Sequence, residues 1–217
     1  MPHHVVSRRW TLAGAASTLL LPATTVGAAR PIATPSQTEG PFYPTGAARP
    51  SDRDADLLIL SGRPGQAAGD TIYVKGRVST LDGAAISGAE VQIWQANAKG
   101  VYNHPSDGND PTFQGFGAVA TDAEGRYRFR TLRPAGYGSM FFRRPPHIHF
   151  KVLIRGRPVL TTQMYFADEA GNSRDGILNS VDNAAARAAL IVPFRPSPAI
   201  EPGSQSGSFD IVISAPA

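Results

Sequence analysis

The chain of 217 residues contains no cysteine, and charged residues make up only 18% of it. The absence of cysteine excludes disulfide-stapled scaffolds, thiolate zinc sites, iron–sulfur clusters and a cysteine nucleophile. Any metal must therefore be held by His, Tyr, Asp, Glu or backbone oxygen. With 41% apolar residues, the low charge also excludes a disordered acidic or basic chain. No segment after the first thirty residues approaches the length of apolar run that a membrane span needs.

The first 29 residues are expected to be an export signal. Arg8 and Arg9 precede a short, weakly apolar run that ends in small residues at 26–29, which is typical of a Tat-type leader. A free amphipathic N-terminus with two chance arginines is the alternative. A Tat leader predicts that the mature protein is periplasmic or secreted, and that it has no membrane span once the leader is removed.

Basic residues exceed acidic ones by a small margin and are scattered along the chain. Removing the leader, which has no acidic residue, lowers the formal net charge from +4 to about +2. Because nucleic-acid-binding domains gather their basic residues on one face, this pattern does not indicate a nucleic acid as partner.

Glycine and proline together make up about a fifth of the chain, which favours many short strands joined by turns. Period-two patterns predict strands over residues 71–78, 89–94, 118–121, 127–132, 147–154, 159–166 and 208–214. A helix is predicted only over residues 182–190. The predicted fold class is therefore all-β, an antiparallel β-sandwich with an ordered N-terminal arm and one short helix.

The predicted organisation has three parts: a leader over 1–29, an N-terminal arm over 30–69 and a β-sandwich domain over 70–217. The arm is rich in proline and glycine and has little periodicity, so a flexible linker is the alternative reading of it.

Three histidines remain after the leader is removed, and two of them form the pair His147-Ile148-His149 at the start of a predicted strand. Residues i and i+2 of a strand point to the same face, so the pair can hold one metal ion. Surface or hydrogen-bonded histidines are the alternative, and a three-histidine site would also need His104.

Tyr102 and Tyr137 lie in glycine-rich turns, and a phenol ionises at neutral pH only beside a strong Lewis acid such as Fe(III). Core packing is the ordinary role of a tyrosine.

Five blocks of sequence occur in order between residue 34 and the C-terminus. They are Thr34-Pro35-Ser36-Gln37-Thr38-Glu39-Gly40-Pro41; Gly88-Ala89-Glu90-Val91-Gln92-Ile93-Trp94-Gln95-Ala96-Asn97-Ala98 followed by Gly100 and Tyr102; Thr121-Asp122 followed by Gly125, Tyr127 and Phe129-Arg130-Thr131-Leu132-Arg133-Pro134; Arg144-Pro145-Pro146-His147-Ile148-His149-Phe150; and Thr162-Gln163-Met164-Tyr165-Phe166. In order and approximate spacing they resemble the intradiol ring-cleavage dioxygenases, most closely the protocatechuate 3,4-dioxygenase β-chain type. The resemblance covers nearly all of the mature chain.

The resemblance implies a non-haem Fe(III) held by Tyr102, Tyr137, His147 and His149. It implies cleavage of a catechol between its two hydroxylated carbons with O2, giving a cis,cis-muconate-type diacid. Tyr137 would be the tyrosinate that the substrate displaces. Arg144 would lie beside the substrate ring, with a surface ion pair as the alternative, and Gln163 would help to hold Arg144 and the pocket.

Other residues carry weaker expectations. His104 is expected to hydrogen-bond near Tyr102 rather than to bind the metal, and Trp94 and Phe150 are expected to be core residues. Tyr43 could line the pocket, whereas core packing is the expected role of Tyr165.

The chain departs from the protocatechuate β chain between Tyr137 and His147. This segment is shorter and contains Met140, Phe141 and Phe142, which suggest a more apolar pocket wall and put protocatechuate itself in doubt. Few residues separate the leader from the first motif, so a long helical dimerisation domain is not expected. The sequence leaves open which catechol is bound and whether a second subunit or a homo-oligomer completes the pocket.

Two other classes of function compete with the dioxygenase. A catalytically silent β-sandwich binding module would keep the fold without needing all four metal ligands. A zinc or cupin-like hydrolase would need more histidines than the chain contains.

Overall fold

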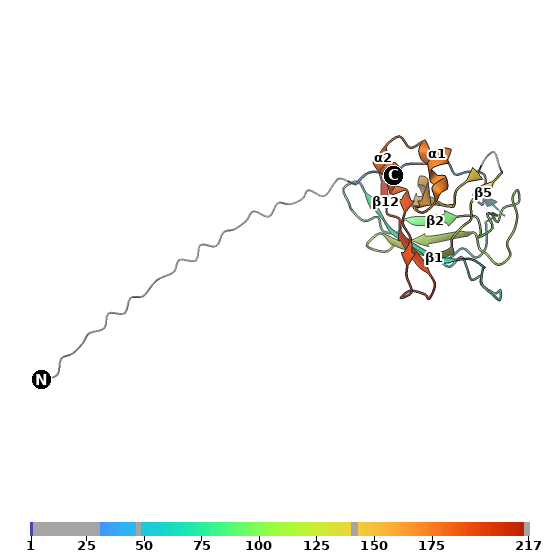
Figure 1. Ribbon diagram of the computed structural model, residues 1–217, viewed down its shortest axis with the longest axis horizontal. Coiled ribbons are helices and arrows are strands. Elements are labelled where there is room, and N and C mark those ends of the chain that lie inside the picture. The colour runs from blue at the N-terminus through green and yellow to red at the C-terminus, as the bar shows by residue number, and fades with distance from the viewer. Residues whose placement is uncertain (2–30, 47–48, 140–142, 215–217) are drawn as a thin grey trace.

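The computed structural model describes residues 1, 31–46, 49–139 and 143–214. Two β-sheets pack against each other, and the helices lie together on one side of the domain, at the top of Figure 1. Apart from Met1, the predicted leader lies outside the described residues, as do Met140, Phe141 and Phe142. Within the described ranges, no helix is long and apolar enough to cross a membrane.

The first sheet is built around β1, Thr71–Thr80. β4 pairs with β1 in antiparallel orientation, whereas β11 and β12 pair in parallel with its first and second halves. β10 extends the sheet beyond β11. The bounds of these strands are Arg126–Leu132 for β4, Arg195–Pro196 for β10, Gln205–Ser208 for β11 and Ile211–Ile213 for β12.

The second sheet has the strand order β3-β2-β7-β8-β9, and all neighbours are antiparallel except β8 and β9. A separate two-stranded ribbon joins β5 to β6. The strand bounds are Glu90–Trp94 for β2, Phe116–Ala120 for β3, Tyr137–Gly138 for β5, Arg143–Arg144 for β6, His147–Ile154 for β7, Arg157–Phe166 for β8 and Ile191–Val192 for β9. The helical elements are a 3-10 turn η2 at Ala170–Arg174, α1 at Gly176–Asn179 and α2 at Ala184–Ala189.

The predicted all-β sandwich with an ordered arm is confirmed, with differences of detail. The predicted strand over 208–214 is divided between the end of β11 and β12. The sheets are mixed, because β1 has two parallel partners and β8 has one. The predicted helix at 182–190 is α2, and the shorter η2 and α1 precede it. The two-residue strands β5, β6, β9 and β10 were not predicted, because two residues are too few to show a period.

The middle strand β7 is buried on both faces. Ile148, Phe150 and Val152 point into the core between the two sheets, together with side chains from β1, β2 and β4. The alternate residues His147, His149 and Lys151 point to the outer face, and they are buried as well. The outer face of this sheet must therefore be covered by another segment.

The arm provides that cover. Its backbone at Gln37 bonds to the Thr161 carbonyl at 2.8 Å, and the Thr162 hydroxyl donates to the Pro35 carbonyl at 2.8 Å. Farther along the arm, Glu39 forms an ion pair with Lys151. The first two contacts fasten the arm to the edge of β8, and the ion pair holds it over the outer face of β7. The arm thereby shields that face from water.

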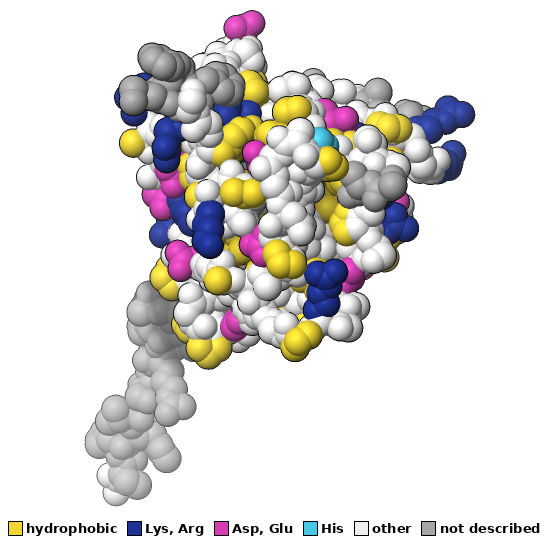
Figure 2. Space-filling model, turned by 90° about the vertical axis from the view of Figure 1, so that its right-hand side faces the viewer, with side chains coloured by type: hydrophobic (Ala, Val, Ile, Leu, Met, Phe, Trp, Pro, Cys, Tyr) yellow, Lys and Arg dark blue, Asp and Glu magenta, His cyan; other side chains and the backbone are white. Residues whose placement is uncertain are grey.

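A charged cluster ties β1, β4 and the C-terminal segment together at the surface. Arg130 bonds to Glu201 at 2.8 Å and to Asp56 at 3.0 Å, and the Tyr73 hydroxyl donates to Glu201 at 2.7 Å. These hydrogen bonds, chiefly the one from Arg130, lower the pKa of Glu201 from its ordinary 4.5 to about 2. Elsewhere, on the face shown in Figure 2, basic and acidic side chains are interspersed.

The cluster predicts a pH-dependent contribution to stability. Because the pKa of Glu201 is lower in the folded chain, the stabilisation is complete above about pH 4.5 and is lost as the pH falls toward 2. Glu201→Gln is expected to lower the free energy of unfolding by about 1–2 kcal/mol at pH 7, less than the pKa shift alone implies because the pair is partly exposed to solvent. Urea unfolding at a series of pH values checks this, with Glu124→Gln, in an exposed ion pair with Arg126, as control. An equal loss for Glu201→Gln at pH 7 and pH 2 would contradict it.

Candidate metal centre

The register of three strands places one row of side chains on the covered outer face. Trp94 of β2 pairs with His149 of β7, which in turn pairs with Gln163 of β8. Directly paired residues of antiparallel strands share a face, so these three lie side by side. Two residues nearer the start of β7, and on the same face, His147 pairs with Tyr165.

Each histidine is fixed by a different neighbour. The His147 Nδ1 lies 2.7 Å from the Pro145 carbonyl, so this nitrogen carries the hydrogen and Nε2 keeps a free lone pair. The His149 ring stacks on Trp94, with ring centroids 4.6 Å apart and planes 12° from parallel. Its Nδ1 is buried and makes no hydrogen bond to any described residue.

The two tyrosines come from loops that glycine allows to approach closely. Gly100 has a φ of +80°, and a Cβ there would lie 2.7 Å from the Gly136 carbonyl oxygen. A Cβ on Gly136 would in turn meet the Arg144 carbonyl at 2.6 Å. Only glycine fits at both positions, so the loops that carry Tyr102 and Tyr137 come together.

The structure brings all four residues predicted as ligands into one cluster. The Tyr102 hydroxyl lies 3.4 Å from His147 Nε2, and the rings of His147 and His149 are 4.9 Å apart. The Tyr137 ring lies 5.3 Å from Tyr102 and 5.6 Å from His147. Two phenols and two imidazoles thus lie together at the N-terminal end of β7. Their assignment as iron ligands stays a prediction.

Burial determines the protonation of this cluster. It lowers the pKa of His147 to about 3, with help from the charge of Arg144, and it lowers the pKa of His149 well below its usual range. Both imidazoles are therefore neutral and able to bind a metal. Burial also raises the pKa of Tyr102 and Tyr137, so both phenols keep their protons unless a strong Lewis acid lies beside them.

The donor set fits a hard, highly charged metal ion. Two phenol oxygens and two imidazole nitrogens suit ferric iron, and on ionisation the two phenolates would balance two of its three positive charges. Within the described residues, no group of three or more His, Asp or Glu side chains is placed to hold a metal. The described residues therefore do not provide the three-histidine site of a zinc hydrolase, and His104 instead bonds through Nδ1 to the Ser106 hydroxyl at 2.7 Å.

Arg144 lies beside the cluster as a buried cation. Its Nη2 donates to Gln163 Oε1 at 2.7 Å and to the Tyr165 hydroxyl at 3.3 Å, and its Nε donates to Asp175 at 2.5 Å. Gln163 also donates to the Thr38 carbonyl at 3.1 Å, so it links Arg144 to the arm. The structure thus places Gln163 beside Arg144, where it was expected, and Arg144 is in a buried ion pair rather than a surface one.

Sequence reasoning missed two residues of the site. Asp175 caps α1 and pairs with Arg144. The only sequence signal for it is its place directly before Gly-Ile-Leu, where a helix can start. Phe42 directly follows the arm motif, and its ring stacks on Tyr102 at 4.5 Å and meets Tyr137 edge-on at 5.8 Å. Tyr43 next to it packs edge-on against Trp94 at 4.8 Å.

The expected core residues divide between two clusters. Phe150 lies in the core between the sheets, whereas Trp94 belongs to a smaller apolar cluster under the arm. Tyr165 is fully buried, in agreement with core packing, but its hydroxyl reaches Arg144.

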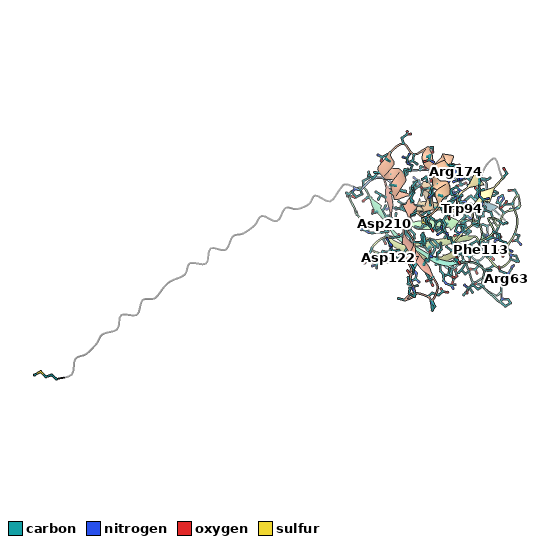
Figure 3. The ribbon with its side chains drawn as sticks, in the orientation of Figure 1. Arg63, Trp94, Phe113, Asp122, Arg174 and Asp210 are labelled. Atoms are coloured by element: carbon teal, nitrogen blue, oxygen red, sulfur yellow. The ribbon has the colours of Figure 1, made fainter. Side chains whose placement is uncertain are left out.

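A cavity of about 460 Å³ lies beside Tyr102, which is the one predicted ligand among its lining residues. In Figure 3 three of its lining residues, Trp94, Phe113 and Arg63, follow one another from the middle of the domain to its rim. Neither histidine of β7 nor Tyr137 lines it. A ligand held at the centre of the four rings would therefore not occupy this cavity.

The chain matches a family model described as Dioxygenase over residues 38–215. It is 38% identical over 170 residues to the protocatechuate 3,4-dioxygenase beta chain of Burkholderia cepacia, covering 74% of this chain and 71% of that one. It is 36% identical over 177 residues to catechol 1,2-dioxygenase 2 of Acinetobacter lwoffii, covering 72% of this chain and 62% of that protein.

Solved structures show the same architecture. The dioxygenase domain of a dioxygenase carbohydrate-binding protein fusion from Streptomyces sp. SirexAA-E superposes with a TM-score of 0.62 at 29% identity, covering 85% of this chain and 100% of that one. Catechol 1,2-dioxygenase from Acinetobacter sp. ADP1 gives a TM-score of 0.64 at 29% identity, covering 85% and 64%.

The position of Gln163 predicts a large cost for its replacement. Gln163→Leu removes one hydrogen-bond partner each from Arg144 Nη2, from the Tyr165 hydroxyl and from the Thr38 carbonyl, the first two in a buried setting and the third in a part-buried one. We expect the free energy of unfolding to fall by about 2–4 kcal/mol, since unpartnered buried polar groups are costly. Guanidinium unfolding measures the loss, with the exposed Gln66→Leu as matched control, expected to change it by less than about 0.5 kcal/mol. Equal effects of the two substitutions would contradict the bridging role.

Proposed function

This chain belongs to the intradiol dioxygenase family, as its motifs predicted, and on that basis we propose that it is a non-haem Fe(III) enzyme that cleaves catechols. The proposed reaction breaks the carbon–carbon bond between the two hydroxylated carbons. Both atoms of O2 enter the product, a cis,cis-muconate-type diacid, so no external reductant is consumed.

The convergence of two tyrosines and two histidines at the end of β7 carries the proposal. Tyr102, Tyr137, His147 and His149 would hold the ferric ion. When bound, the ion would ionise the two phenols and draw electron density from a chelated catechol, which opens the ring to O2. A silent binding module would have no need for this donor set in a buried cluster.

The two tyrosines are proposed to play different parts. Tyr102 is 2% exposed and lies under the Phe42 ring, so it stays in place. Tyr137 is only partly buried, on the two-residue strand β5. It is therefore the phenolate that can move aside and take a proton on its oxygen from an incoming catechol.

Arg144 is proposed to act on the substrate ring. It is adjacent to Tyr137, since the two residues pair across β5 and β6. A fixed guanidinium in a water-poor site stabilises negative charge that develops on a neighbouring ring. The segment 140–142, where the sequence departs from the protocatechuate β chain, lies outside the described residues, so catechol without substituents is the appropriate first probe.

The metal and the reaction can be tested together. Aerobically purified protein, supplemented with Fe(III), is expected to show a visible phenolate-to-iron absorption band that shifts when catechol is added. With ¹⁸O₂, mass spectrometry is expected to find two labelled oxygens in a muconate product. A colourless protein after iron supplementation, or a product cleaved outside the diol, would overturn the proposal.

Ligand variants test the assignment of residues. Tyr102→Phe and His149→Ala are each expected to reduce bound iron by more than about tenfold and to abolish ring cleavage, because each removes a donor atom. His104→Ala is the matched control, since His104 bonds to Ser106 outside the cluster, and it is expected to keep both iron and activity. Full iron and full activity in the Tyr102 and His149 variants would show that the ligand set is wrong.

We also propose that the protein is exported by the Tat route, on the strength of Arg8 and Arg9 before a short apolar run. Arg8→Lys with Arg9→Lys is expected to leave the full-length precursor in the cytoplasm, because the paired arginines are the feature that this route recognises. Cell fractionation with antibody detection measures this, with Arg53→Lys as a control outside the leader. Unchanged export of the double variant would contradict the proposal.

A further inference from the structure

Arg144 is a charge that the fold has removed from water. Its side chain is 5% exposed, and that of its partner Asp175 is fully buried. A buried cation without a counter-charge is strongly destabilising, whereas a paired one is tolerated. Among the groups that bond to Arg144, Gln163 and Tyr165 are neutral, so Asp175 supplies the negative charge.

The partners of Arg144 occupy one edge of its guanidinium. Asp175 takes the Nε hydrogen, and Nη2 is shared between Gln163 and Tyr165, with Asp175 Oδ1 at 3.5 Å. Nη1 bonds to none of these three. Because the guanidinium is planar, fixing the Nε and Nη2 edge also fixes where Nη1 points.

The Asp175 carboxylate is itself held by the start of α1. Its Oδ1 accepts from the Leu178 backbone N–H at 2.8 Å, and the Asp175 carbonyl accepts from the Asn179 side chain at 2.8 Å. Oδ2 receives the short hydrogen bond from Arg144 Nε, whereas Oδ1 caps the helix and makes only the longer, 3.5 Å contact with Nη2. The start of α1 therefore fixes the Asp175 carboxylate, and this carboxylate fixes the guanidinium of Arg144.

We infer that Asp175 is a positioning residue for the ring-cleavage reaction, acting only through Arg144. It neutralises the buried guanidinium and sets its plane beside Tyr137, the residue that pairs with Arg144 across β5 and β6, where an incoming aromatic substrate would lie. The inference rests on the proposed function for its effect on catalysis, and on the geometry of Arg144 and Asp175 for its mechanism. A ring displaced by about 1 Å relative to its charged partner reacts about a hundredfold more slowly.

Asp175→Asn tests this with little change of shape, because asparagine also caps helices well. In iron-loaded protein, with catechol as substrate, we expect kcat to fall about 10–100-fold while KM changes less than about threefold. In an Arg144→Gln background, the same substitution is expected to change kcat less than about twofold, because the residue through which it acts is gone. Asp168→Asn, which removes an exposed partner of Arg133, is the matched control and is expected to leave kcat unchanged.

Denaturant midpoints of the four proteins in this cycle give a readout that does not depend on iron or turnover. If Asp175 holds Arg144, the two substitutions are non-additive in the unfolding midpoint as well. If Asp175→Asn lowers kcat as much in the Arg144→Gln background as in the parent, Asp175 does not act through Arg144. Additive midpoints would show that Asp175 does not hold Arg144 in place. If the parent chain cleaves no catechol, the proposed function fails, and the midpoints still decide whether Asp175 holds Arg144.

Discussion

The buried guanidinium of Arg144 is the constraint on which the arrangement of the site depends. A cation that is 95% withdrawn from water needs a carboxylate and further acceptors in fixed positions. Its partners come from β8 and from the start of α1, and one of them, Gln163, reaches on to the arm. Segments far apart in the sequence are therefore held together by a single charge, and that charge lies beside the residues predicted to bind iron.

The site also depends on the N-terminal arm, which covers it. β7 is the middle strand of its sheet, so its outer face would be solvated if residues 34–43 did not lie across it. The arm removes water from His147 and His149, which keeps both imidazoles neutral, and it brings Phe42 onto Tyr102. The same segment thus stabilises the fold and sets the electrostatics of the candidate metal centre.

Much of the fold could be predicted from local patterns. The strand over 147–154 was predicted with the bounds that the structure gives, because Pro145 and Pro146 mark its start and its apolar residues alternate toward the core. Asp175 and Phe42 could not be predicted as site residues, since each meets its partner only after distant segments pack. The two-residue strands β5 and β6, which place Tyr137 beside Arg144, carry no periodic signal.

The sequence by itself determined the residue types of the site and the local geometry of the His147-Ile148-His149 pair, because alternation along a strand is a property of the backbone. It also determined the family, through motifs that occur in a shared order. Only the tertiary structure decided that Tyr102 and Tyr137 meet these histidines, that the arm buries them, and that Asp175 balances Arg144. Those outcomes depend on strand register, on the close approach of glycine loops and on the cost of burying charge, and each of these is decided between segments far apart in the chain.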